Sequence, residues 1–192
     1  EITFLGSGDF HHVSDILIER FNEPITVIDF DFHPDWDITL PILHCGSWVS
    51  RALKRKNILK IVELGPSSDD LSSFWIQTCD LDALKDDRLE IYPYSHSETR
   101  VFLKKIPENI SIERSNGPIS GKIRWNELRD KNGPELLRHI LRRLPTKKVY
   151  LSIDKDCLTN DYAVTNWEEG RLSLDDLMLM LRLIKDNTDI VG

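Results

Sequence analysis

The stretch VIDFDFHPDWD, residues 27–37, is the most informative part of this sequence. The stretch begins where an apolar run ends. Every second residue from Asp29 to Asp37 is Asp or His, with Phe, Pro or Trp between them. Alternate side chains of an extended chain share one face. Four carboxylates and one imidazole would therefore crowd together, and a protein tolerates such crowding when cations lie between the carboxylates.

The composition is that of an ordinary globular protein. The 192 residues fit one domain, 1–192, and are 40% hydrophobic and 30% charged. A formal charge of -7 argues against nucleic acid as a partner. No apolar stretch of membrane-spanning length and no signal peptide occurs, and the three cysteines form no C-x-x-C pair. We expect a cytoplasmic protein with no membrane partner, and leave open whether the natural chain extends beyond either end.

Short β-branched runs alternate with helical patterns. Strands are expected in the runs 2–5, 25–28, 58–62, 89–92 and 149–153, and helices in VSDILIERF, SWVSRALKR, GPELLRHILRRL and SLDDLMLMLRLI. This alternation predicts an α/β fold of three αβα layers around a mostly parallel central sheet. The segment 67–129 is the least regular, and PYSHSE and IERSNGPISGK are interpreted as surface turns.

Three polar clusters each follow an apolar run. They are GDFHHVS, DFHPDWD and DKDCL. In open parallel sheets, sites form outside the carboxyl ends of the strands, so the three clusters are expected to converge. Asp oxygens with a minority of imidazoles suit Mn²⁺ or a similar divalent ion. Four Asp and two His are enough to hold two ions, which together acidify a water for attack.

These motifs resemble those of the ureohydrolase superfamily, which includes arginase, agmatinase and formiminoglutamase. DFHPD resembles its Asp-Ala-His-x-Asp motif, YLSIDKDCL its Ser-x-Asp-x-Asp strand end, GSGDFHHVS its Gly-Gly-Asp-His-Ser segment, and LHCGSWVSRAL its His-Gly stretch before a helix. The motifs occur in the family's order over essentially the whole chain. The resemblance implies an arginase-like fold, which deacetylases share.

The resemblance also implies the roles of particular residues. The matching metal ligands are His11, Asp31, His33, Asp35, Asp154 and Asp156. His11 aligns best as the second imidazole, and a shift of one residue would choose His12 instead. His44 matches the histidine that passes a proton to the leaving amine. The implied enzyme is a Mn²⁺-dependent hydrolase with two ions, Zn²⁺ or another divalent ion being the alternative. Its metal-bridging hydroxide would attack a C–N bond of a small cationic or guanidino-type substrate, and the chain would form a homo-oligomer.

Some positions depart from the family pattern. Thr159 stands where an Asp is usual, the later Gly-Gly turn reads WEEGR, and the family's guanidinium-binding acidic residue would lie beyond Gly192. Two alternatives therefore stay open: a zinc-dependent deacetylase on the same fold, and a degenerate member that binds metal or ligand without turnover. Asp29 and Asp37 are interpreted as outer groups rather than ligands. A solvated loop is the preferred interpretation of Glu168 and Glu169, and core packing that of Trp36 and Trp48.

Overall fold

A five-stranded parallel sheet forms the centre of the molecule, in the order β3-β2-β1-β7-β8. The computed structural model describes residues 2–38, 42–129 and 132–192. The strands are β1 (Ile25–Phe30), β2 (Ile58–Gly65), β3 (Leu89–Pro93), β7 (Lys148–Ile153) and β8 (Asp189–Ile190). The strands β1, β2 and β3 are buried almost throughout, as expected for a parallel sheet covered on both faces.

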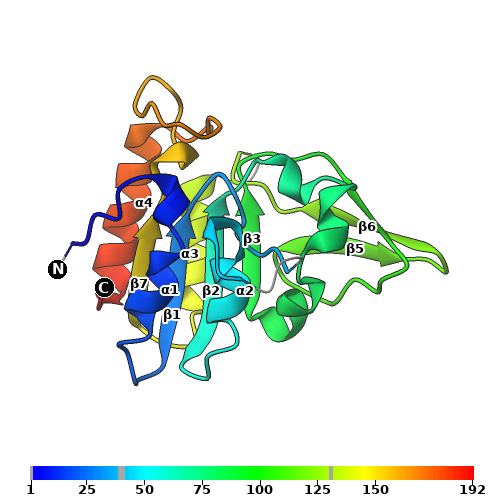
Figure 1. Ribbon diagram of the computed structural model, residues 1–192, viewed down its shortest axis with the longest axis horizontal. Coiled ribbons are helices and arrows are strands. Elements are labelled where there is room, and N and C mark those ends of the chain that lie inside the picture. The colour runs from blue at the N-terminus through cyan, green and yellow to red at the C-terminus, as the bar shows by residue number, and fades with distance from the viewer. Residues whose placement is uncertain (1, 39–41, 130–131) are drawn as a thin grey trace.

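Two pairs of helices cover this sheet, one pair on each face (Figure 1). The helices are α1 (Val13–Ile18), α2 (Trp48–Ala52), α3 (Gly133–Arg142) and α4 (Leu174–Asn187). Val27 of β1 packs with the buried side chains of α1 and α2, whereas Ile28 packs with those of α3 and α4. Successive side chains of β1 point to opposite faces of the sheet and therefore belong to two different hydrophobic clusters. The predicted three-layer α/β fold class is confirmed.

The helix boundaries follow from local chemistry. The side chain of Ser173 accepts a hydrogen bond from Asp176 N at 3.0 Å and donates one to the Asp176 carboxylate at 2.7 Å, which caps α4 as its sequence predicts. A proline stands in the first turn of α3, where its missing N–H costs nothing. A side-chain N-cap such as Ser173 stabilises its helix by about 1 kcal/mol.

Two expectations about strands are wrong. The run Ile2–Leu5 forms no strand; Ile2 is 82% exposed and Phe4 is 92% exposed, so β-branched composition without a pairing partner is insufficient. The segment IERSNGPISGK is largely a β-hairpin rather than only a surface turn. Its strands belong to a second, antiparallel sheet in the order β4-β6-β5, made of β4 (Thr99–Phe102), β5 (Ile112–Asn116) and β6 (Ser120–Trp125).

This second sheet extends beyond the β3 edge of the central sheet (Figure 1). Short 3-10 helices occupy the connections: η1 (Gly8–Phe10), η2 (Cys45–Ser47), η3 (Asp69–Leu71), η4 (Trp75–Thr78), η5 (Leu81–Asp87) and η6 (Lys155–Cys157). The organisation of residues 1–192 as one domain stays a prediction. Within the described ranges, no helix has the length and apolar character needed to cross a bilayer.

Candidate metal centre

Two neighbouring strand ends bring the acidic motifs together. Asp31 follows β1 and Asp154 follows β7, and these strands are parallel neighbours with Phe30 opposite Ile153. Their carboxyl ends therefore lie at the same edge of the sheet. The Asp154 side chain accepts a hydrogen bond from Asp156 N at 3.1 Å and so starts η6, which turns Asp156 back toward the same edge.

A third segment, around η1 near the N-terminus of the chain, also lies at this edge of the sheet. His11 ends the short helix η1, and Gly8 in that helix lies so close to the cluster that an added Cβ would be 2.9 Å from Asp154 Oδ2. Glycine allows this approach. His11 is 5% exposed and points into the cluster, whereas Nδ1 of His12 contacts the carbonyl oxygen of Asp9 at 3.0 Å. The structure thus places His11, and not His12, among the carboxylates.

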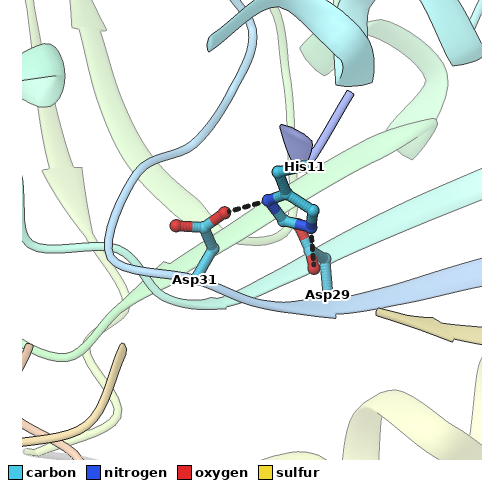
Figure 2. A group of neighbouring side chains, drawn as sticks. All are labelled: His11, Asp29 and Asp31. Atoms are coloured by element: carbon cyan, nitrogen blue, oxygen red, sulfur yellow. Dashed lines mark ion pairs between the residues drawn. The ribbon is translucent and has the colours of Figure 1, made fainter. Parts of the chain in front are cut away.

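Three carboxylates surround one nitrogen of His11. Nδ1 lies 2.8 Å from Asp31 Oδ2, 3.3 Å from Asp35 Oδ2 and 3.8 Å from Asp154 Oδ2. Figure 2 shows the first of these contacts, and on the other side of the ring Nε2 lies 3.6 Å from Asp29 Oδ1. Nδ1 is buried and forms no hydrogen bond of suitable geometry in the described part of the chain. A ring nitrogen in this position can share its lone pair with a cation.

A second group shares Asp31 with the first. His33 Nδ1 lies 3.1 Å from Asp156 Oδ2 and 3.7 Å from Asp31 Oδ1. Asp31, His33 and Asp156 offer ligand atoms within 4.8 Å of one another. The two oxygens of Asp31 thus face different imidazoles. The six residues predicted as ligands converge, and a donor set of carboxylates and imidazoles of this kind could hold divalent metal.

Hydrogen bonds hold the ligand side chains in these positions. The His33 backbone N–H donates to Asp31 Oδ1 at 2.7 Å, and the Phe32 N–H donates to Asp156 Oδ1 at 3.1 Å. The indole Nε1–H of Trp48 donates to Asp35 Oδ2 at 2.7 Å. Partners of this kind orient metal ligands in proteins.

Burial and the neighbouring charges shift the pKa values of the side chains in the cluster. Burial lowers the pKa of both imidazoles, but the surrounding carboxylates outweigh burial, so that the pKa of His11 is well above its usual value and that of His33 is about 12. Burial raises the pKa of Asp31, yet its close contacts with the two imidazoles outweigh this effect and hold the pKa well below its usual range. Burial raises the pKa of Asp156 to about 6 and also raises that of Asp154. A divalent ion must displace these protons to bind.

The cluster lies in a cavity of about 500 Å³. His44 lines this cavity, 3.9 Å from Asp37 Oδ2, and its Nε2 is buried without a hydrogen bond within the described residues. Trp75 and Trp167 line it as well, and the Trp167 ring meets His33 edge-on with centroids 5.6 Å apart. The cavity thus combines the candidate ligands, one further imidazole and aromatic walls.

Several other interpretations can now be compared with the structure. Glu168 lies in a loop with its side chain 62% exposed, as the solvated-loop interpretation expects, and it also lines the cavity with Oε2 3.2 Å from His33 Nε2. Glu169 accepts hydrogen bonds from Asn160 and is not among the described residues that line the cavity. Trp36 and Trp48 are buried as expected. The sequence reasoning missed the bond from Trp48 to Asp35 and the contact of Ser152 Oγ with His11 Nε2 at 2.7 Å. Strand alternation from Asp154 could have pointed to Ser152.

Comparisons with known proteins place the fold but name no family. No model of a known protein family matches the sequence. An uncharacterized protein from Thermotoga maritima is 30% identical over 183 residues, which cover 95% of this chain and 52% of that protein. The crystal structure of formimidoylglutamase from Bacillus subtilis superposes with a TM-score of 0.64 and 17% sequence identity, over 97% of this chain and 49% of that one.

The chain spans about half the length of both proteins that it matches. At 17% identity, the superposition shows a common fold and not a common activity. The protein has an arginase-like α/β fold, shared with the formimidoylglutamase structure, and a cluster of His and Asp side chains that could hold metal lies at the carboxyl end of its sheet.

Proposed function

We propose that this protein is a metal-dependent hydrolase that cleaves a non-peptide C–N bond in a small guanidino, amidino or related molecule. The observation that carries the proposal is the convergence of six ligand-type side chains in the lining of one cavity, with Asp31 in contact with both imidazoles. The fold likeness to a formimidoylglutamase supports the same reaction class.

The residues divide the work of holding metal. His11 and Asp35 would hold one ion, and His33 and Asp156 would hold another. Asp31 lies within reach of both imidazoles, and Asp154 lies 3.8 Å from His11 Nδ1. Mn²⁺ is the proposed metal because oxygen ligands with few imidazoles suit it. Divalent ions bound there would supply Lewis-acid chemistry and an acidified water.

His44 is the proposed proton donor to the leaving nitrogen. It lines the same cavity as the ligands, and its Nε2 is buried without a hydrogen bond to any described residue. Asp37 Oδ2 lies 3.9 Å from this nitrogen. A departing amine must collect a proton, and a positioned imidazole provides it near neutral pH.

The charge of the cavity favours a cationic substrate. Beyond the candidate ligands, Asp37, Asp69, Asp70 and Glu168 line it, and no Lys or Arg is among the described residues that do so. Carboxylate walls attract cations and repel free carboxylates. Trp75 and Trp167 add faces on which a planar cation can stack.

The test is activity against a panel of guanidino, amidino, formimidoyl and acetylated-amine compounds, read as release of urea, formamide, ammonia or acetate. We expect the chelated protein to be inactive and Mn²⁺ to restore cleavage of a C–N substrate. His44→Asn should bind Mn²⁺ as the wild type does and lose a factor of about 100 or more in kcat. Activity that survives exhaustive chelation would exclude the proposal. Acetate release with one bound Zn²⁺ per chain would favour a deacetylase instead.

A further inference from the structure

Two buried carboxyl groups lie side by side beneath the candidate metal centre. Asp29 of β1 and Glu63 of β2 are register partners in adjacent parallel strands, and both are 0% exposed. Neighbouring strands are about 4.8 Å apart. Val27 and Ile61, two residues earlier in each strand, belong to the hydrophobic cluster beneath α1 and α2. Alternation therefore puts both carboxyl groups on that same face.

Among the described residues, no Lys or Arg compensates either group, and Asp29 faces only the His11 imidazole, with Nε2 3.6 Å from Oδ1. No oxygen of Asp29 or Glu63 has a hydrogen-bond partner within the described residues. Glu90 in the next strand shows how the chain treats another carboxylate that is 0% exposed: Lys60 Nζ lies 2.5 Å away, and the guanidinium of Arg143 donates to both oxygens at 3.2 Å. A buried charge without partners is strongly destabilising, so Asp29 and Glu63 call for a ligand that the chain does not supply.

The surrounding atoms are ligands for a hard cation. In Figure 2, Asp29 lies on the far side of the His11 ring from Asp31. Ligand atoms of these three residues lie within 4.8 Å of one another. Ser152 Oγ lies 2.7 Å from His11 Nε2 and brings a hydroxyl to the same side of the ring as Asp29. Oxygen donors carrying two negative charges suit one divalent cation of the Mg²⁺ or Mn²⁺ kind.

We propose that Asp29 and Glu63 bind one divalent cation in an inner site, on the Nε2 side of His11 and separate from the two groups that share Asp31. One such ion balances both carboxylates. A cation in the inner site would hold Asp29 against the Nε2 side of His11 and so fix the position of the ring. The inner site can exist whether or not the protein is an enzyme.

The test counts Mn²⁺ ions per chain by elemental analysis after loading and desalting. Glu63→Gln keeps the size of the side chain and removes its charge, and we expect it to bind one ion fewer than the wild type. Asp29→Asn should lose the same ion, which keeps the test decisive if one variant fails to fold. An exposed control, Glu108→Gln, should leave the count unchanged.

A second comparison separates this site from the proposed function. Asp156→Asn alters one of the two groups that share Asp31, here called the outer groups, and leaves the inner site intact. Adding Glu63→Gln to this variant should again remove one ion. The difference of one ion is expected whatever the outer groups bind. Equal counts in the wild type, Glu63→Gln and Asp29→Asn would overturn the inner site and leave a carboxyl pair that shares a proton. If the wild type binds an ion at Asp29 and Glu63 but none at the two groups that share Asp31, the proposed function is refuted and the inner site is not.

Discussion

Asp31→Asn is the substitution whose effect on the metal-free protein follows most directly from the structure. The Asp31 carboxylate is 1% exposed, accepts the His33 N–H at 2.7 Å and lies 2.8 Å from His11 Nδ1. Because these contacts hold its pKa well below the usual range, Asp31 is ionised at neutral pH and stabilises the fold there. An amide keeps the shape of the side chain and removes the charge that compensates both imidazoles.

The size of the effect can be estimated from burial. Removing one partner of a buried ion pair costs about 3–5 kcal/mol. In a domain of this length each kcal/mol lowers Tm by about 2–4 °C, so a decrease of about 10 °C is expected. Asp29 is the matched comparison, two residues earlier and equally buried. Burial raises its pKa to about 7, so its ionised form is unfavourable and Asn there should cost less than about 1 kcal/mol at pH 8.

Urea unfolding in EDTA at pH 8, followed by far-UV circular dichroism, measures both variants against the wild type. We expect Asp31→Asn to lower the urea midpoint with an unchanged slope, and Asp29→Asn to leave the midpoint unchanged or raise it. The reasoning would be refuted by equal midpoints for wild type and Asp31→Asn, or by a larger loss for Asp29→Asn.

Three further predictions concern the same region. Since the pKa of Asp29 is raised to about 7, its contribution to stability is complete below about pH 4 and is lost as pH rises through 7; urea midpoints of the metal-free protein should fall from pH 5 to pH 8, and a rise would contradict this. Trp48→Phe removes the donor 2.7 Å from Asp35, and calorimetric titration should show Mn²⁺ affinity reduced by about tenfold, unchanged affinity being the contrary result. Gly170→Ala would put a Cβ 2.1 Å from the Cys157 carbonyl oxygen and should cost about 1–3 kcal/mol in unfolding experiments, so a neutral substitution would show that this loop packs differently.

The sequence was sufficient to predict four of the five strands of the central sheet, β1, β2, β3 and β7, and the convergence of the ligand-type residues. The apolar runs before Asp31 and Asp154 form adjacent parallel strands, and parallel neighbours necessarily end at one edge. Motif order added His11, although it left His12 open. The choice required the backbone path of η1, which turns one ring toward the carboxylates and the other toward Asp9.

Contacts between distant segments could not be predicted from spacing. The register of β1 and β2 decides that Glu63 lies beside Asp29, and no motif marks that pairing. The alternation seen in residues 27–37 also fails beyond β1. The extended strand ends at Phe30 and Asp35 adopts a φ of 42°, so Asp37 lies toward His44 rather than in the cluster. Local charge patterns therefore predicted the identity of the residues in the cluster. They did not predict the contacts between those residues.

The most direct test is a crystal structure of the Mn²⁺-loaded protein with anomalous scattering measured at the manganese edge. The account predicts two peaks flanking the Asp31 carboxylate, one near His11 and Asp35 and the other near His33 and Asp156. A map without manganese at Asp31, or with a single ion there at full loading, would contradict it.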